Sequence, residues 1–224
     1  MPFRDRAEAG QRLAAALVGY RGRDVVVVAL PRGGVPVAAA VATVLDAPLD
    51  LVLVRKIGAP FHEELAMGAV ADAAGQPRTV RNEDIIATLG VDDETFDAAR
   101  AVQLHEIERR RKAYLGDRPR AALAGRVAIV VDDGVATGAT TRAALRAVRR
   151  QGPAKLVLAV PVAPTDTLAE LRDEADEVVC LEAYPAFGAI GLYYVDFRQV
   201  SDDEVTAILA RFPPDDRVAA SGKR

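Results

Sequence analysis

Two neighbouring carboxylates, Asp132 and Asp133, stand between an apolar run at 127–131 and a turn rich in glycine and threonine. Carboxylates that leave a buried parallel strand can accept hydrogen bonds from the vicinal hydroxyls of a sugar or hold a hydrated Mg²⁺. The turn at 134–141 adds N–H groups and threonine hydroxyls at the expected start of a helix, which suits a phosphate. An ordinary aspartate-capped turn would explain one acid and one threonine, so the whole run predicts a site for a phosphorylated ribose.

A glycine pair, Gly33 and Gly34, follows a second apolar run at 25–30, with Arg32 immediately before it. Glycine lets the backbone approach an anion closely, and the forked guanidinium of an arginine matches phosphate oxygens. A glycine pair alone is weak evidence, but this one follows the first expected strand and lies upstream of the two acids. The loop is therefore predicted to bind phosphate groups beside them.

Two further cations, Arg55 and Lys56, come directly after the apolar run at 49–54. Ligands of open parallel sheets bind beyond the carboxyl ends of the strands. Three strand ends are therefore expected to converge on one anionic ligand. The alternative is that both cations are simply solvated side chains at the end of a strand.

Short β-branched runs alternate with helix-length stretches along the chain, which favours a parallel sheet covered by helices. Several of the runs are apolar on both faces, as a buried parallel sheet requires. The expected fold class is α/β, with a doubly wound, mostly parallel sheet. Strands are expected at 25–30, 49–54, 67–71, 127–131, 155–160 and 177–181, and helices at 6–18, 36–45, 94–114, 139–150, 165–174 and 202–211. Ser201 and Glu204 predict a capping box on the last helix.

The chain has 224 residues, of which 50% are hydrophobic, and this suits one large globular domain, expected over residues 1–212. Residues 76–120 interrupt the alternation because they are polar and hold one long helical stretch. A helical insertion is therefore predicted there. Residues 213–224 are predicted to form a flexible tail.

The composition argues against several classes of protein. A net charge of −3 argues against general binding to nucleic acid or to an anionic membrane. Prolines, glycines and an arginine break the most apolar stretch, 25–45, so no segment is expected to span a bilayer. One cysteine, Cys180, and two histidines leave no internal disulfide and no zinc cluster. A cytoplasmic protein is therefore expected.

The run from the apolar strand through the two acids closely resembles the phosphoribosyl pyrophosphate (PRPP) motif of the type I phosphoribosyltransferases, in which Thr-Gly-x-Thr follows an acidic pair. The resemblance implies the fold of that family and a bound PRPP. Asp132 and Asp133 would bind the ribose hydroxyls. The residues around the 5′-phosphate would be Gly134, Val135, Ala136, Thr137, Gly138, Ala139, Thr140 and Thr141.

The loop at Arg32, Gly33 and Gly34 is similar to the pyrophosphate loop of the same family, and the resemblance implies a cis peptide between Pro31 and Arg32. The Arg55-Lys56 pair looks like a segment of adenine phosphoribosyltransferases, which adds both cations to the implied PRPP site. The resemblance extends from about residue 3 to about residue 211.

The C-terminal stretch 182–200 is similar to the hood of purine phosphoribosyltransferases. This implies that Phe187, Tyr193 and Tyr194 bind the base. It also implies that Asp196 lies near a metal ion that PRPP and water mainly hold. Aromatic side chains at this density are equally well explained as the packed core of the hood itself.

The implied reaction is phosphoribosyl transfer, in which a nitrogen acceptor, with a purine base as one candidate, displaces pyrophosphate from Mg²⁺-bound PRPP. The two acids would hold the ribose while charge builds on the sugar. Arg32, Lys56 and the metal would stabilise the departing pyrophosphate. Ala136 stands where hypoxanthine-guanine enzymes carry a base-facing aspartate, so no general base is identified. The implied partners are PRPP, the small acceptor and, as an open option, a second copy of the chain in a homodimer.

The alternative is a PRPP-binding regulator that has no transferase activity. No helix-turn-helix motif for binding DNA is visible, which counts against that interpretation. A sugar-phosphate hydrolase on the same scaffold is a weaker alternative, because no nucleophile stands out.

Overall fold

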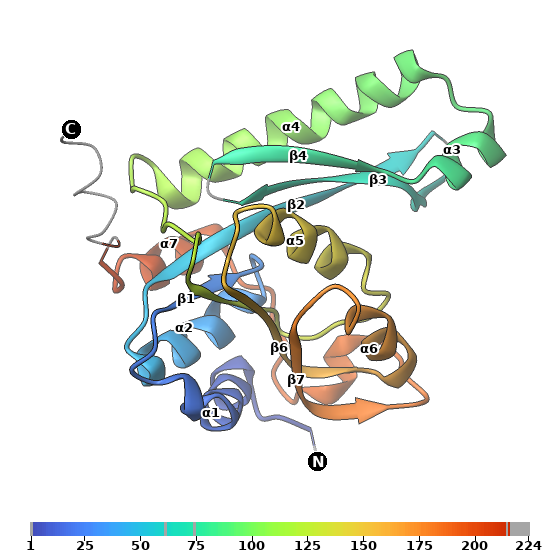
Figure 1. The fold of residues 1–224 in the computed structure, drawn as a ribbon. Coiled ribbons are helices and arrows are strands. Elements are labelled where there is room, and N and C mark those ends of the chain that lie inside the picture. The colour runs from blue at the N-terminus through green and yellow to red at the C-terminus, as the bar shows by residue number, and fades with distance from the viewer. Residues whose placement is uncertain (1, 61, 74, 214, 216–224) are drawn as a thin grey trace.

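The computed structural model describes residues 2–60, 62–73, 75–213 and 215, which form a seven-stranded sheet with helices on both faces (Figure 1). The strand order is β4-β3-β2-β1-β5-β6-β7. The parallel strands are β1 (Val25–Ala29), β2 (Leu49–Ala59), β5 (Val127–Val131), β6 (Lys155–Pro164) and β7 (Glu177–Tyr184). β3 (His62–Ala73) and β4 (Gln76–Arg81) extend the sheet beyond β2 in antiparallel pairing. The predicted α/β fold with a mostly parallel sheet is confirmed.

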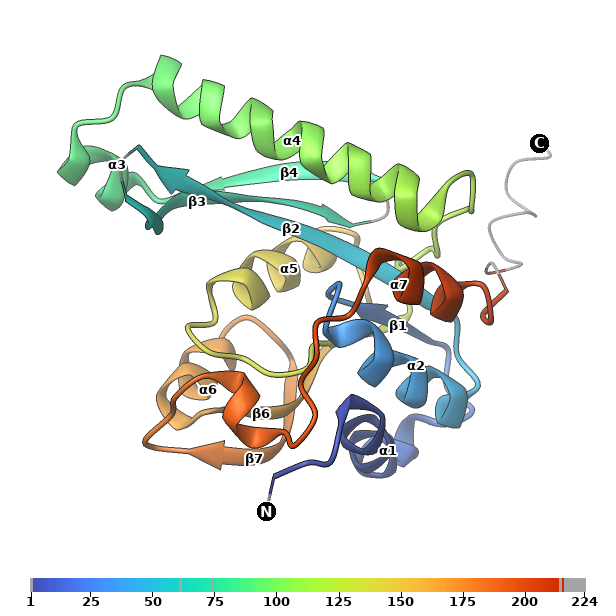
Figure 2. The same ribbon diagram turned by 180° about the vertical axis from the view of Figure 1, so that it is seen from behind.

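The helices divide between the two faces of the sheet because successive residues of a buried strand point to opposite sides. Val27 of β1 packs into one core and Val28 into the other. The first core is covered by α1 (Arg6–Ala16), α2 (Gly34–Leu45), α4 (Asp93–Leu115) and α7 (Asp202–Leu209), and the second by α5 (Ala139–Arg149) and α6 (Thr165–Leu171). Figure 2 shows α4 lying along the antiparallel strands, with α7 beside it.

The short helices η1 (Val18–Tyr20), α3 (Glu83–Leu89) and η2 (Ile190–Tyr193) complete the fold. The ends of the longer helices agree closely with those predicted from the sequence. The predicted capping box of Ser201 and Glu204 is present at the start of α7. The predicted tail at 213–224 lies, apart from residues 213 and 215, outside the described part of the chain. Within that described part, no helix is both long and apolar enough to cross a membrane.

The prediction that residues 76–120 form a helical insertion is wrong at its start, where β4 occupies Gln76–Arg81. β4 is an edge strand that is largely open to solvent, so it shows none of the apolar alternation that predicts a half-buried strand. Its Pro77 is tolerated because an edge strand need not donate every N–H group to a ladder. The rest of the segment contains α3 and the long α4, as its helical pattern predicts.

A buried ionic cluster joins the segment after α4 to the first residues of β2. Asp50, 4% exposed, accepts hydrogen bonds from Nε of Arg120 at 2.9 Å and from the N–H of Ala121 at 2.8 Å. Asp72 on β3 lies 3.7 Å from the same guanidinium, and burial raises the pKa of its carboxyl. The cluster ties the antiparallel strands to the parallel part of the sheet.

Asp50→Ala is expected to lower the free energy of unfolding by about 3–5 kcal/mol, because it leaves Arg120 without its closest counter-charge in a buried position. Urea denaturation measures this value. Asp97→Ala is the matched control, since Asp97 forms an exposed pair with Arg100 and should change the value by no more than about 1 kcal/mol. Equal effects of the two substitutions would contradict the assigned role of Asp50.

Candidate functional site

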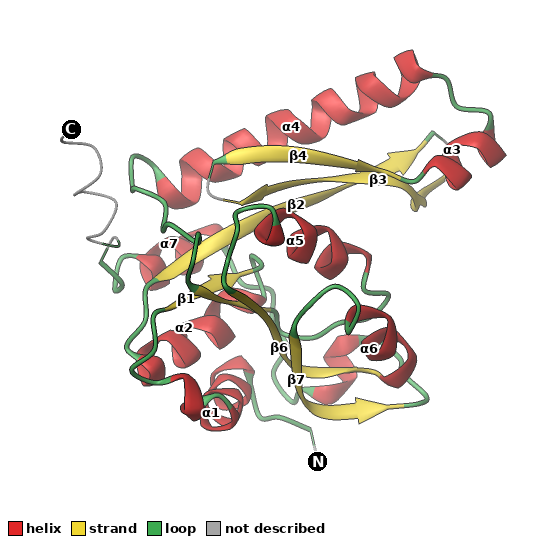
Figure 3. Ribbon diagram, in the orientation of Figure 1, coloured by secondary structure: helices red, strands yellow, loops and turns green. Residues whose placement is uncertain are grey.

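The candidate site lies at the carboxyl ends of the central parallel strands, where loops leave the sheet (Figure 3). Asp132 and Asp133 follow β5 directly. Asp133 is only 7% exposed, whereas Asp132 is half-buried. The Oδ1 atom of Asp132 accepts the N–H of Asp133 at 2.9 Å. The chain therefore presents two adjacent carboxylates at the sheet edge, one of them more accessible than the other.

The glycine loop after β1 lies directly against these acids, as the sequence predicts. A Cβ atom on Gly33 would lie 2.0 Å from Oδ2 of Asp133, and one on Gly34 would lie 2.7 Å from the carbonyl oxygen of Val131. Only glycine permits this approach of the two loops. The peptide bond between Pro31 and Arg32 is cis, as the family resemblance implies.

Arg32 points toward α7, which the sequence does not predict. Its Nη1 lies 3.3 Å from Oδ1 of Asp202, and the hydroxyl of Tyr114 donates to the same oxygen at 2.7 Å. Burial and the bond to Asp202 raise the pKa of Tyr114 to about 12, and the Tyr114 hydroxyl holds the pKa of Asp202 below its usual range. α4 and α7 thus hold the arginine of the glycine loop.

The turn from Gly134 to α5 has the form expected of a phosphate site. Gly138 caps α5 with a φ of 74°, in the left-handed region that favours glycine. The exposed Thr137 and the half-buried Thr140 bring hydroxyls to the start of the helix. Thr141 is only 3% exposed, so its side chain is largely withdrawn from the surface of the turn.

Arg55 and Lys56 do not stand at the end of a strand as predicted, because β2 continues to Ala59 by pairing with β3. Side chains of adjacent strand residues point to opposite faces. Arg55 donates from Nε to Oε1 of Gln103 on α4 at 3.1 Å, and Lys56 is exposed. Both nevertheless line a hollow of about 690 Å³ together with Thr140, which belongs to the turn at 134–141.

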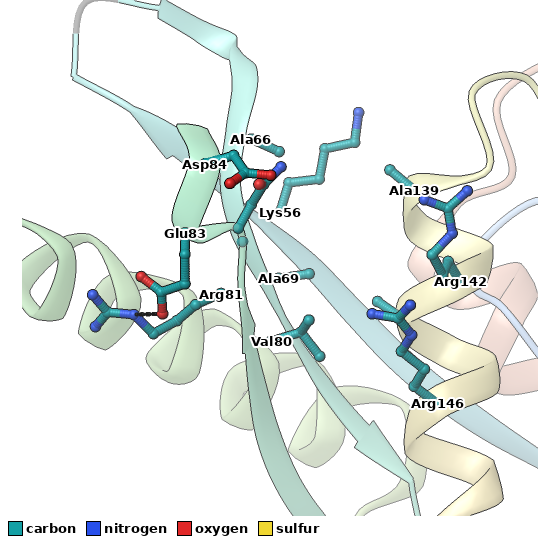
Figure 4. Close-up of a pocket in the computed structure, with 13 residues that line it drawn as sticks. Lys56, Ala66, Ala69, Val80, Arg81, Glu83, Asp84, Ala139, Arg142 and Arg146 are labelled. Atoms are coloured by element: carbon teal, nitrogen blue, oxygen red, sulfur yellow. Dashed lines mark hydrogen bonds and ion pairs between the residues drawn. The ribbon is translucent and has the colours of Figure 1, made fainter. Parts of the chain in front are cut away.

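Lys56 also lines a second hollow of about 400 Å³ between the β3–β4 hairpin and α5. Figure 4 shows Lys56 reaching across this hollow toward the wall that carries Ala139, Arg142 and Arg146. Both arginines are ion-paired with glutamates of the α6 region, whereas Lys56 forms no ion pair in the described part of the chain. The ammonium group of Lys56 could therefore meet an anionic group of a ligand bound beside this hollow.

Tyr194 is not accessible to a base, contrary to the expectation from the hood resemblance. Its ring is 6% exposed and lies 5.4 Å from the ring of Phe3 and 5.0 Å from that of Phe197. Its hydroxyl donates to the carbonyl oxygen of Asp133 at 2.6 Å, and burial raises its pKa. Tyr194 therefore belongs to the packed core of the hood.

The two other aromatic candidates are half-buried and stacked on each other. The ring of Tyr193 lies 4.7 Å from that of Phe187 and 4.8 Å from that of Tyr184. Both faces of Tyr193 are therefore covered by neighbouring rings. Phe187 ends the stack, so it is the better placed of the three predicted residues to receive a flat ligand.

Asp196 is engaged by Arg198, whose N–H and Nε donate to its Oδ1 at 3.2 and 3.0 Å. These bonds lower the pKa of Asp196. The described residues contain no group of three or more acidic, histidine or cysteine side chains that would hold a metal. The oxygen donors at Asp132 and Asp133 nevertheless suit a hydrated Mg²⁺ that receives its other ligands from phosphates.

Arg6 of α1 is the main site residue that the sequence does not reveal. Its Nε lies 2.7 Å from Oδ2 of Asp133, and both side chains are largely buried. Burial and the charge of Asp133 raise the pKa of Asp132 well above its ordinary value. Burial also raises the pKa of Asp133, while Arg6 counteracts this effect. No motif marks Arg6, because it lies in an ordinary helix far from the acids in sequence.

Comparison with known proteins shows the family of this chain. Residues 4–198 match the family model described as the phosphoribosyl transferase domain. The chain belongs to this family. Two Mycobacterium tuberculosis proteins, from strains H37Rv and CDC 1551, are provisionally named phosphoribosyl transferases, and each is 47% identical over 209 residues. That alignment covers 93% of this chain and 46% of each relative, so the chain spans about half the length of these curated relatives.

A solved structure shares the fold of this phosphoribosyltransferase domain over nearly its whole length. The protein TT1426 from Thermus thermophilus is 43% identical, with a TM-score of 0.81, and the match covers 95% of this chain and 100% of that one. The segment matched by the family model contains Arg6, the glycine loop, the acids Asp132 and Asp133, and the turn at 134–141. It ends before α7, whose Asp202 holds Arg32.

Proposed function

We propose that this domain transfers the ribose 5-phosphate of Mg²⁺-bound PRPP to a nitrogen acceptor and releases pyrophosphate. The contact between Gly33 and Asp133 carries the proposal, because it joins the two loops that would bind the two ends of PRPP. The acids would accept hydrogen bonds from the ribose, the turn into α5 would receive the 5′-phosphate, and the glycine loop would receive the pyrophosphate.

The side chains around these loops would stabilise the transition state. Negative charge grows on the leaving pyrophosphate as the bond at C1′ breaks, so cations placed there lower the barrier. Arg32 and Lys56 are the proposed cations, and Arg55 lies in the same hollow as Lys56. Bound Mg²⁺ would supply further positive charge to the leaving group. Asp132 and Asp133 would hold the metal through water or through the ribose, and Asp196 would contribute only after release from Arg198.

The direct test is to incubate the protein with Mg²⁺, PRPP and a panel of nitrogen bases and to measure pyrophosphate release. Release with at least one acceptor supports the proposal, and calorimetry should show PRPP binding that requires a divalent cation. Binding without release for any base would favour the PRPP-binding regulator instead. Absence of PRPP binding would overturn both assignments.

Arg32→Ala and Lys56→Ala are each expected to lower kcat more than they raise the KM for PRPP. The charge that these cations face on the leaving group grows only in the transition state. Steady-state kinetics separate the two parameters, and Lys112→Ala is the control because Lys112 is an exposed lysine on α4. A raised KM with an unchanged kcat would show that both cations act in binding alone.

Any nucleobase acceptor is expected to be a purine, and Phe187→Ala is expected to raise its KM. Ala136 stands where hypoxanthine-guanine enzymes carry a carboxylate that faces the base, and no cation of the proposed site is assigned to bind the negative charge of orotate. Phe187 ends the aromatic stack, and lost stacking costs about 0.5–1.5 kcal/mol beyond the buried area. The KM for each base measures the effect. Faster conversion of orotate than of every purine would contradict this acceptor class.

A further inference from the structure

An acid on α7 holds the arginine of the glycine loop by a single contact. Nη1 of Arg32 lies 3.3 Å from Oδ1 of Asp202, and the two side chains are 29% and 40% exposed. Within the described part of the chain, the guanidinium of Arg32 makes no other hydrogen bond. A guanidinium has five N–H donors in a fixed fork. The edge formed by Nε and Nη2 therefore stays free for two oxygens of a phosphate group.

The carboxylate of Asp202 has a fixed position that does not depend on a ligand. The hydroxyl of Tyr114 donates to the same Oδ1 at 2.7 Å, and Tyr114 is only 4% exposed. That bond, together with the nearby Arg32, holds the pKa of Asp202 below its usual range, so the carboxyl is ionised at neutral pH. A buried phenol thus sets the position of the negative charge that Arg32 meets.

The helix that carries Asp202 is held at both ends. A capping box closes its start, and Arg118 donates from Nη1 to the carbonyl oxygen of Leu209 at 2.7 Å at its end. Val205 and Leu209 are buried in the core that α2 and α4 also cover, and Figure 2 shows α7 beside α4. Asp202 therefore has a support that is independent of the glycine loop.

An arginine that must meet a leaving group benefits from being ordered in advance. A long side chain loses rotamer freedom when a ligand immobilises it, and this loss weakens binding. Contact with Asp202 removes part of that freedom beforehand. Because the contact is made through Nη1 of Arg32 alone, a phosphate group can bind the other edge of the guanidinium without breaking it.

We propose that Asp202 and Tyr114 are positioning residues, which direct the guanidinium of Arg32 toward the leaving pyrophosphate. This inference rests on the proposed function, and it adds two helices, α4 and α7, to the ligand-binding loops. Asp202 lies beyond residue 198, where the match to the family model ends.

Calorimetry with inorganic pyrophosphate and Mg²⁺ tests this role, because pyrophosphate carries the charge that develops on the leaving group. Tyr114→Phe removes one hydroxyl and changes no charge at neutral pH. It is expected to weaken binding by about twofold to tenfold, the value of ordering one long side chain. Tyr20→Phe is the matched control, since the buried Tyr20 makes the same kind of bond to Glu177, at the start of β7 and away from the glycine loop.

A double-variant cycle separates positioning from a general structural effect. Asp202→Asn keeps the shape of the side chain but removes a negative charge, and this removal by itself favours an anionic ligand. The Arg32→Ala background measures that charge effect alone. The loss of affinity caused by Asp202→Asn should therefore be about twofold to tenfold larger with Arg32 present than in the Arg32→Ala background. Asp203→Asn, at an exposed position on the same turn, should have equal effects in both backgrounds.

The outcomes distinguish failure of the inference from failure of the proposed function. A wild-type protein that binds neither Mg²⁺-PRPP nor Mg²⁺-pyrophosphate would overturn the proposed function. Equal effects of Asp202→Asn in the two backgrounds would overturn the inference, as would tighter binding by Tyr114→Phe, which would mean that Asp202 withholds Arg32 from the ligand. Binding of Mg²⁺-PRPP without binding of pyrophosphate, or an Arg32→Ala variant that binds pyrophosphate as tightly as the wild type, would also overturn it.

Discussion

Gly33→Ala is expected to lower the affinity for Mg²⁺-PRPP by about tenfold to a hundredfold, because an added methyl group in a filled space costs about 1–3 kcal/mol. The new Cβ would lie 2.0 Å from Oδ2 and 2.5 Å from Cγ of Asp133, so the carboxylate or the loop must move. The backbone is not the obstacle. Gly33 has a φ of −60° and a ψ of −36°, which alanine adopts readily.

Calorimetric titration with Mg²⁺-PRPP measures this effect, and Gly19→Ala is the matched control. A Cβ on Gly19 meets nothing within 4 Å, so the same change of residue should leave the affinity as it is. Unchanged affinity in Gly33→Ala would show that the glycine loop and the acids need not touch in the ligand-binding state.

Asp132→Asn is expected to raise the melting temperature at neutral pH while it lowers the affinity for PRPP by about tenfold to a hundredfold. Burial and the charge of Asp133 raise the pKa of Asp132, so the ionised form lowers the stability of the fold. Asparagine keeps the oxygen that accepts the N–H of Asp133 and removes the charge. Each kcal/mol gained corresponds to about 2–4 °C in Tm for a domain of this size.

The raised pKa of Asp132 also predicts how the difference in melting temperature between the two proteins depends on pH. An aspartate in the unfolded chain loses its proton at about pH 4, whereas Asp132 keeps its proton in the fold to a higher pH. The destabilisation is therefore absent below about pH 4, grows as the pH rises through the raised pKa, and is complete above it. Scanning calorimetry of both proteins across this range should show a Tm difference that disappears in acid. A lower Tm for Asp132→Asn at pH 7 would contradict the prediction.

The sequence by itself determined the features that depend on neighbouring residues. The strand 127–131, the two acids and the turn into α5 form one continuous segment, so residue types and spacing suffice to recognise it. The glycine pair is equally local, and the parallel order of the sheet follows from the alternation of strands and helices. The family, the fold and the contact of the two loops could therefore be predicted from the sequence.

Only the tertiary structure decided which partners the side chains around that segment contact. Arg6 lies 127 positions before Asp133, and only the packing of α1 beside the sheet brings them together. The end of β2 is set by pairing with β3, not by its own residues, and this pairing places Arg55 and Lys56 within the strand instead of after it. Tyr194 and Phe187 are equivalent candidates in the sequence, since both are aromatic residues of the stretch 182–200. In the structure Tyr194 is buried against Phe3, whereas Phe187 ends the stack on Tyr193. Burial and ion pairing are properties of distant neighbours, which spacing along a chain does not encode.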